Sequence, residues 1–209
     1  MVGADWIRKA YHAILAGDFE QAAICFEEAV SLEPENAEYH HKLSVTYSRS
    51  GRLERALSTA QKAVKLDPDN QVYKQQMQQV KSKELLAKAS VRLDKLTAQP
   101  ATGDLGNHGG ILLPLSGDGL ESELLDTIVM LRKAIHLDPL SGEAYLLLAV
   151  ACGAVGDDQE AVWNVSEALR LNPGLPDGKR LYAQYSARLA NRMNEPEHKR
   201  RNDHGQLYH

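Results

Sequence analysis

A 34-residue period organises this chain of 209 residues. An alanine, a second alanine seven residues later and a proline five residues after that recur at three places. The three sets are Ala22, Ala29 and Pro34; Ala56, Ala63 and Pro68; and Ala161, Ala168 and Pro173. The first two sets are 34 residues apart, and Pro173 lies 34 residues after Pro139. Because a fixed period of this length is typical of helical repeats, it constrains the fold class more than any local pattern.

Each period reads as two amphipathic segments with a glycine between them and a proline after them. Gly17, Gly51 and Gly156 stand between the segments, and glycine readily takes the left-handed conformation that ends a helix. Leu-Glu-Pro, Leu-Asp-Pro or Leu-Asn-Pro follows the second segment, and proline cannot continue the helical hydrogen-bond ladder. The sequence therefore predicts an all-α chain of helical hairpins.

These positions resemble the tetratricopeptide repeat family, whose pattern is W-x2-L-G-x2-Y, then A-x3-F, A and P. The second repeat supplies His40, Leu43, Ser44, Tyr47, Ala56, Ala60, Ala63 and Pro68. The last supplies Tyr145, Leu148, Ala149, Cys152, Ala161, Val165, Ala168 and Pro173. The first supplies Trp6, Ala10, Ala22, Phe26, Ala29 and Pro34, with Lys9 where leucine is usual. The resemblance implies a right-handed superhelix of hairpins, a helical solenoid, that binds other proteins without chemistry of its own.

The repeat breaks once, between Pro68 and Pro139, which are 71 residues apart, 37 more than one period. Residues 99–120 hold two prolines and six of the fifteen glycines, so they cannot form the missing first helix. We therefore expect an insert within the third repeat. The expected division is a solenoid over 1–192, with repeats at about 3–36, 37–70, 71–141 (insert about 85–121) and 142–175, a cap helix at 176–192, and a flexible basic and polar tail at 193–209.

The segment from Gln71 to Ala98 contains no glycine or proline, and its apolar residues lie on two faces. Tyr73, Met77 and Val80 share one face, and Leu86, Ala89, Leu93 and Leu96 lie nearly opposite. Either one long helix packs oppositely at its two ends, or the helix breaks near Ser82 and Lys83. We favour one helix, because two would leave an odd number of helices before the insert.

The second of these faces is close in sequence to an apolar string in the insert. Either the string folds back over the face, or the face contacts a partner or a second copy, since exposed apolar surface often marks an interface. A loop without function is the third alternative. The candidate second interface consists of Leu86, Leu93, Leu96, Ile111, Leu112 and Leu113.

The resemblance implies a concave groove lined by the first helix of each hairpin. The candidate partner-binding residues there are Ile7, Tyr11, His41, Lys42, Val45, Arg49, Gln75, Gln76 and Gln79. One subfamily clamps the C-terminal carboxylate of heat-shock chaperones with lysine, asparagine and arginine in these helices. Here those positions keep only one cation, Lys42, so we expect no such clamp. An extended or helical segment with apolar and acidic side chains suits this groove better.

Charge alternates along the chain although the net charge is only −4. Residues 40–100 hold 12 basic and 5 acidic side chains, and residues 101–178 hold 3 and 12. The alternation steers a charged partner toward the middle of the superhelix, lets molecules associate head to tail, or reflects solvated helix faces. The mild net charge disfavours a dedicated binder of nucleic acid or anionic membranes.

Neither catalytic nor cofactor-binding nor metal-ligating residues emerge from the sequence. The glycine-rich stretch 103–110 lacks the preceding strand and the Gly-Lys-Ser/Thr ending of a phosphate-binding loop. Cys25 and Cys152 lack CxxC spacing and suit a reducing compartment. No apolar run approaches the length that spans a bilayer.

These observations predict a non-catalytic, cytoplasmic protein–protein interaction module without a cofactor. It acts as an adaptor or assembly factor that binds a peptide segment or partner protein in the groove. One alternative is a self-associating structural or scaffold protein, which makes a homo-oligomer the partner. A further alternative is a regulatory or accessory subunit of an enzyme. Nucleic acid is not an expected partner.

Overall fold

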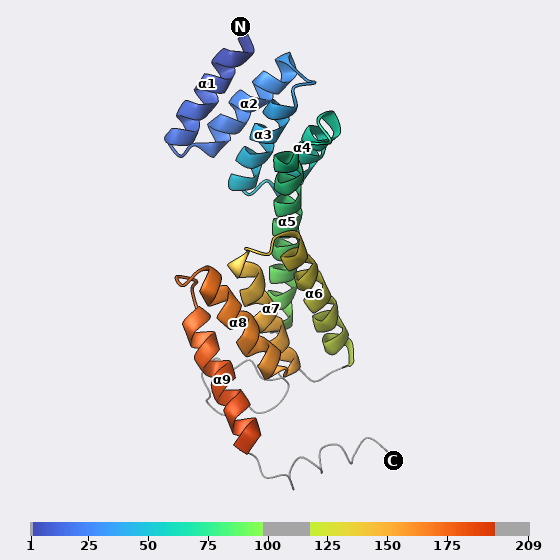
Figure 1. Cartoon of the computed structure of the whole chain (residues 1–209), viewed down its shortest axis with the longest axis vertical. Coiled ribbons are helices and arrows are strands. Elements are labelled where there is room, and N and C mark those ends of the chain that lie inside the picture. The colour runs from blue at the N-terminus through green and yellow to red at the C-terminus, as the bar shows by residue number, and fades with distance from the viewer. Residues whose placement is uncertain (1, 98–117, 195–209) are drawn as a thin grey trace. The chain divides into compact units, whose positions relative to one another are not determined.

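The structure is a computed structural model that describes residues 2–97 and 118–194. These residues form helices and turns without a strand, which confirms the predicted all-α class. Ile111, Leu112 and Leu113 of the insert, and the tail after Asn194, lie outside the described residues. The described helices are α1 (Val2–Leu15), α2 (Phe19–Leu32), α3 (Ala37–Arg49), α4 (Leu53–Leu66), α5 (Gln71–Thr97), α6 (Asp118–Leu137), α7 (Gly142–Val155), α8 (Asp158–Leu171) and α9 (Gly178–Asn194) (Figure 1).

The chain divides into two compact units, and α5 contributes to both. Unit 1 contains the chain up to Ala87 together with His136–Asp138. Unit 2 contains Lys88–Ile135 and the chain from Pro139 onward. In unit 1, α1 packs on α2, α3 packs on α4, and α2 packs on α3. In unit 2, α8 packs on both α7 and α9, so each unit is built of neighbouring helical hairpins.

The turns confirm the predicted hairpin chemistry. Gly17, Gly51 and Gly156 have φ angles of 76°, 77° and 87°, in the left-handed region that a side chain disfavours. The Asp18 and Asp157 carboxylates that follow the first and third of these glycines each accept a hydrogen bond from the third backbone N–H of the next helix. Helices α2, α4, α6 and α8 all end at a leucine two residues before a proline, as the Leu-x-Pro pattern predicts.

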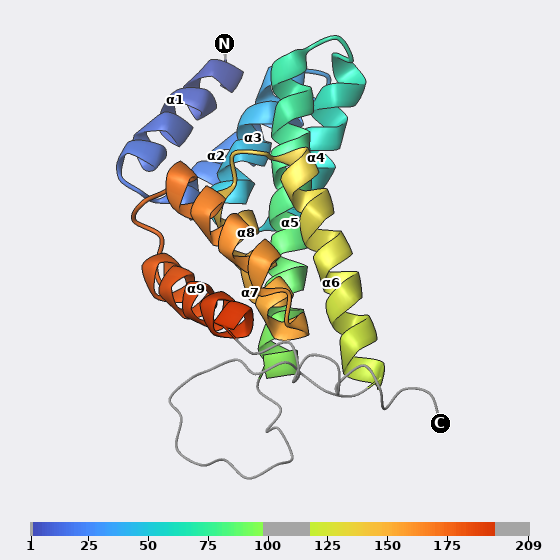
Figure 2. The same ribbon diagram turned by 60° about the horizontal axis from the view of Figure 1, so that its bottom comes forward.

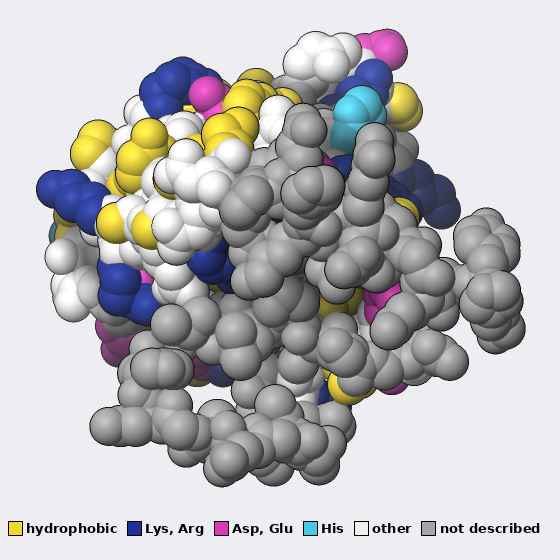
Figure 3. Space-filling model, turned by 90° about the horizontal axis from the view of Figure 1, so that it is seen from below, with side chains coloured by type: hydrophobic (Ala, Val, Ile, Leu, Met, Phe, Trp, Pro, Cys, Tyr) yellow, Lys and Arg dark blue, Asp and Glu magenta, His cyan; other side chains and the backbone are white. Residues whose placement is uncertain are grey.

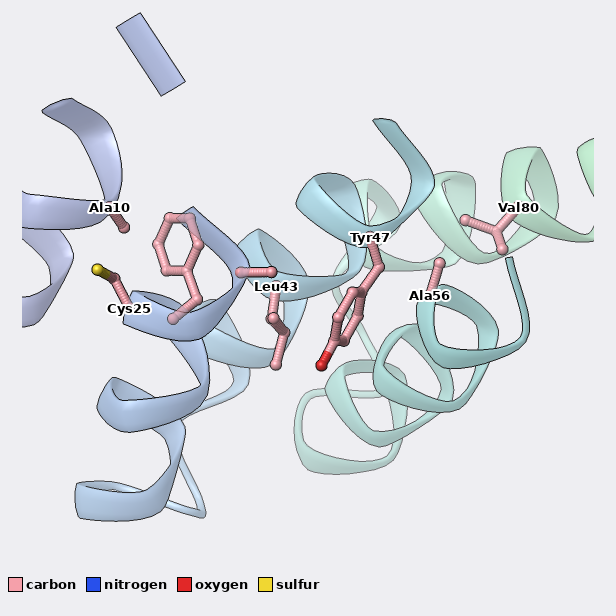
Figure 4. Close-up of a cluster of buried hydrophobic side chains, with 8 residues drawn as sticks. Ala10, Cys25, Leu43, Tyr47, Ala56 and Val80 are labelled. Atoms are coloured by element: carbon pink, nitrogen blue, oxygen red, sulfur yellow. The ribbon is translucent and has the colours of Figure 1, made fainter. Parts of the chain in front are cut away.

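The core of unit 1 joins both hairpins to the first part of α5. Phe26 and Tyr47 are its large aromatic members, and small alanines let the helices approach closely (Figure 4). Burying a side chain the size of Phe26 stabilises a fold by roughly 1.5–3 kcal/mol. The Tyr47 hydroxyl donates a hydrogen bond to the Glu27 carboxylate. Burial, together with Glu27, raises the pKa of Tyr47 to about 12.

One helix covers the segment whose apolar residues lie on two faces. Helix α5 runs unbroken through Ser82 and Lys83, so the expectation of a single long helix is confirmed. Val80 on the first face belongs to the unit 1 core. Residues 88–97 belong to unit 2, where they run beside α6 (Figures 1 and 2). The helix therefore changes face because its two ends belong to different cores.

Helix α9 closes unit 2 and is fixed to the turn between α7 and α8. Its Tyr185 is fully buried. Arg188 Nη2 lies 3.0 Å from Asp158 Oδ1, and Arg192 Nη1 lies 3.4 Å from Asp158 Oδ2. Arg188 also donates a hydrogen bond to the Gly153 carbonyl oxygen. Because the Asp158 side chain is completely buried, both arginines compensate a charge that would otherwise lie unpaired in the interior.

Candidate functional site

The first-helix side of unit 1 brings a lysine together with aromatic rings from three helices. Lys42 on α3 places its Nζ 5.1 Å from the centre of the Tyr11 ring on α1. The same Nζ lies 2.6 Å from Glu38 Oε1, one turn earlier on α3. His41 on α3 packs its ring against that of Tyr73 on α5, with the centres 4.9 Å apart and the planes tilted by 34°. We call these five residues the Lys42 face.

Helix periodicity explains why Lys42 and His41 face different neighbours. They are adjacent on α3 and so differ by about 100° in direction. Lys42 therefore reaches toward α1, whereas His41 reaches toward α5. As a result, consecutive side chains of one helix join three helices into a continuous aromatic and cationic surface.

Lys42 is a fixed positive charge on this surface. Burial alone would lower its pKa, but hydrogen bonds with Glu38 and Tyr11 outweigh burial and raise the pKa above its ordinary value. The side chain keeps 22% of its surface exposed. A cation held against an aromatic ring is attracted to the ring face and is partly preorganised for an anionic ligand.

His41 contributes a neutral ring at physiological pH. Burial lowers its pKa, and the neighbouring Lys42 charge lowers it further. An uncharged imidazole packed against Tyr73 offers a flat, largely apolar contact rather than a second cation. The Lys42 face therefore presents the Lys42–Glu38 ion pair beside aromatic surfaces.

The other predicted groove residues lie on the same three helices, α1, α3 and α5. Ile7 is half-buried and packs on the unit 1 core, and Val45 is also half-buried. Arg49 is exposed with its guanidinium 5.8 Å from the centre of the Phe19 ring on α2, which places it beside the preceding hairpin. Gln75 is exposed, whereas Gln76 and Gln79 are half-buried.

Two members of the Lys42 face were not among the predicted groove residues. Glu38 has a local signal, because an acidic residue four positions before a lysine on a helix favours an ion pair. The sequence gives less indication for Tyr73, because it shares a helix face with Met77 and Val80 and the pattern therefore predicts a core position. Its half-buried position beside His41 depends on how α5 packs against α3.

The candidate second interface is largely enclosed within the chain. Leu86, Leu93 and Leu96 expose only 6%, 3% and 2% of their surface. This burial leaves little of each of these three side chains for a partner in this conformation. Ile111, Leu112 and Leu113 lie outside the described residues.

Two further kinds of feature, a cluster of metal ligands and a helix that could span a membrane, are absent from the described part of the chain. Within residues 2–97 and 118–194, no three His, Cys, Asp or Glu side chains gather as metal ligands would. Over the same residues, no helix combines the length and apolar character needed to cross a membrane. Exposed hydrophobic side chains do occur, and in Figure 3 they gather beside Lys and Arg side chains on one side of the visible surface.

The fold defines a helical-repeat protein. A family model described as tetratricopeptide repeat matches residues 13–80, which run from the end of α1 into α5. Residues 13–80 therefore contain tetratricopeptide repeat sequence, and the resemblance stated from the sequence is confirmed there. A sequence comparison with curated proteins finds no match.

Several solved structures are similar to the chain at low identity. One is a structure of MamA from Desulfovibrio magneticus RS-1 that begins at its residue 41. It has 14% identity and a TM-score of 0.47, and the match covers 91% of this chain and 93% of the MamA chain. TTC0263, a thermophilic TPR protein in Thermus thermophilus, has 16% identity and a TM-score of 0.40, covering 90% and 82%. The first TPR domain of human RPAP3 has 16% identity and a TM-score of 0.37. The match covers 78% of this chain and 99% of that domain. Similarities this low carry no conclusion about partner or assembly.

Proposed function

We propose that this protein is a non-catalytic adaptor or assembly factor, and that the Lys42 face binds a peptide segment with acidic and apolar side chains. The observation that carries the proposal is the Lys42 ammonium group held 5.1 Å from the Tyr11 ring and partly exposed beside His41 and Tyr73. A carboxylate of the partner would bind Lys42, and neighbouring apolar side chains would pack on the rings.

The chemistry of the Lys42 face supports this choice over a purely apolar ligand. An anion bound to Lys42 makes a charge-assisted hydrogen bond, which is worth about 1.5–3 kcal/mol when formed away from bulk water. The aromatic rings supply rigid contact area at low cost in side-chain entropy. A short segment can therefore gain both orientation and affinity from few residues.

The two cysteines support a cytoplasmic location as part of the same proposal. Cys25 and Cys152 are free and buried. Burial, followed by the nearby Glu160 and Asp157, raises the pKa of Cys152 to about 12, which keeps it an inert thiol. Free, buried cysteines suit a reducing compartment.

A random peptide library displayed on phage tests the binding proposal. We expect the wild-type protein to enrich peptides with Asp or Glu next to apolar residues. Lys42→Glu should weaken binding of an enriched peptide by about tenfold to a hundredfold, the equivalent of one charge-assisted hydrogen bond. Lys65→Glu on α4 is the matched control, because it makes the same charge change at an exposed position outside the Lys42 face. Equal loss in both variants, or no effect of Lys42→Glu, would contradict the proposal.

A further inference from the structure

Helix α6 has an apolar patch on the side opposite its core. Leu124 and Leu131 are fully buried, and Ile128 is 5% exposed. On the other side, Leu125 and Val129 expose 51% and 65% of their surface. Because these two residues are four positions apart, they are neighbours on one helix face. Helix α6 thus has a second apolar face besides the one that unit 2 buries.

Opposite charges flank Val129 of this patch at nearly equal distances along the helix. Asp126 and Lys133 are exposed and seven residues apart, so they point in nearly the same direction, about two turns from each other. Val129 lies near the midpoint between them. Among the described residues, neither Asp126 nor Lys133 forms an ion pair within the chain. Arg132, by contrast, is already engaged, with its Nη2 2.7 Å and 2.8 Å from the two carboxylate oxygens of Glu160.

We propose that this face of α6 binds the same face of a second copy of the chain, with the two helices antiparallel. A two-fold axis beside Val129 places Asp126 of each copy opposite Lys133 of the other, brings the two Val129 side chains together, and sets Leu125 of each copy beside Lys133 of the other. The face is therefore complementary to itself, which is what a closed two-fold interface requires. The parallel arrangement sets Asp126 against Asp126 and Lys133 against Lys133, so like charges disfavour it.

The size of the face predicts a weak dimer rather than a permanent one. A stable interface buries about 800 Å² on each partner, which is more than one short apolar patch with two ion pairs supplies. Most of the association energy comes from removing Leu125 and Val129 from water, and the ion pairs mainly select the antiparallel arrangement. Because exposed ion pairs are screened, added salt should weaken the preference for this arrangement. The interface does not involve the Lys42 face, so this proposal can fail without affecting the proposed function.

Sedimentation equilibrium of the full chain tests the proposal over micromolar to millimolar concentrations. We expect the wild-type mass to rise reversibly toward that of a dimer. Asp126→Lys and Lys133→Asp each place like charges at both symmetric contacts, so each variant alone should dimerise at least tenfold more weakly. An equimolar mixture of the two variants restores both opposite-charge contacts and should recover association, as should the double variant carrying both changes.

Two further variants separate this surface from others. Val129→Asp removes the centre of the patch and should leave the chain monomeric with an unchanged helical circular dichroism spectrum. Val72→Asp makes the same change on α5 and should leave dimerisation intact. Val72 is a matched site because it exposes 59% of its surface and Val129 exposes 65%. A wild-type chain that stays monomeric up to millimolar concentration would overturn the proposal. So would association that survives Val129→Asp, or charge reversals that the mixture fails to rescue.

Discussion

At the scale of single residues, unit 2 depends on a glycine that leaves room for a tyrosine. A Cβ atom on Gly153 would lie 2.4 Å from Cε1 and 2.8 Å from the hydroxyl oxygen of Tyr185. Gly153 is on α7, and the fully buried Tyr185 is on α9. The last helix can therefore approach α7 closely because position 153 has no side chain.

Gly153→Ala should lower the free energy of unfolding by about 1–3 kcal/mol, because the added methyl group overpacks the Tyr185 ring. This loss occurs although alanine is the better helix former by about 1 kcal/mol. Urea titration followed by circular dichroism measures the change. Gly119→Ala on α6 is the control, since nothing lies within 4 Å of its added Cβ, and it should be neutral or stabilising. Equal stability of both variants would contradict the close contact.

Two buried tyrosine hydroxyls predict a loss of stability at alkaline pH. Burial is the main cause that raises the pKa values of Tyr47 and Tyr185 from 10.0 to about 12. The contribution of these protonated hydroxyls to the free energy of unfolding is complete below pH 10. It falls as the pH rises toward 12, because the unfolded chain then loses protons that the folded chain keeps. Absorbance of tyrosinate in the native protein should show two hydroxyls titrating near pH 12. Tyr185→Phe should remove one of them, and titration of all tyrosines near pH 10 would contradict the burial.

At the scale of helices, local chemistry fixes the ends and tertiary packing fixes the faces. Gly17, Gly51 and Gly156, with the Leu-x-Pro endings, were sufficient to predict where most helices begin and end, because these signals act within a few residues. The two faces of α5 were also visible in the sequence. What covers each face was not, since that depends on residues distant along the chain.

Leu93→Ala tests whether the second face of α5 is part of a core. Leu93 is 3% exposed, so the substitution should create a cavity and lower the free energy of unfolding by about 2–5 kcal/mol. Val91→Ala, two residues away on the same helix and 54% exposed, should change it by less than about 0.5 kcal/mol. Chemical denaturation of both variants gives the comparison. If Leu93→Ala instead leaves stability unchanged and alters only the mass in solution, the face is an interface.

At the scale of the whole molecule, the family pattern predicted three members of the Lys42 face but not the other two. Tyr11, His41 and Lys42 were expected, and each contacts a neighbouring helix. Tyr73 was missed because the position of its ring depends on the packing of α5 against α3. The apolar face of α6 was likewise hidden, since a helix pattern alone does not say which of two apolar faces becomes the core.

Chemical-shift mapping by nuclear magnetic resonance tests directly whether the Lys42 face binds a partner. An acidic and apolar peptide enriched from the library would be titrated into the labelled full chain. We predict that the largest backbone shifts fall around Tyr11, Glu38, His41, Lys42 and Tyr73, and that they disappear in Lys42→Glu. Shifts concentrated on α2 and α4, or unchanged in Lys42→Glu, would contradict binding at the Lys42 face.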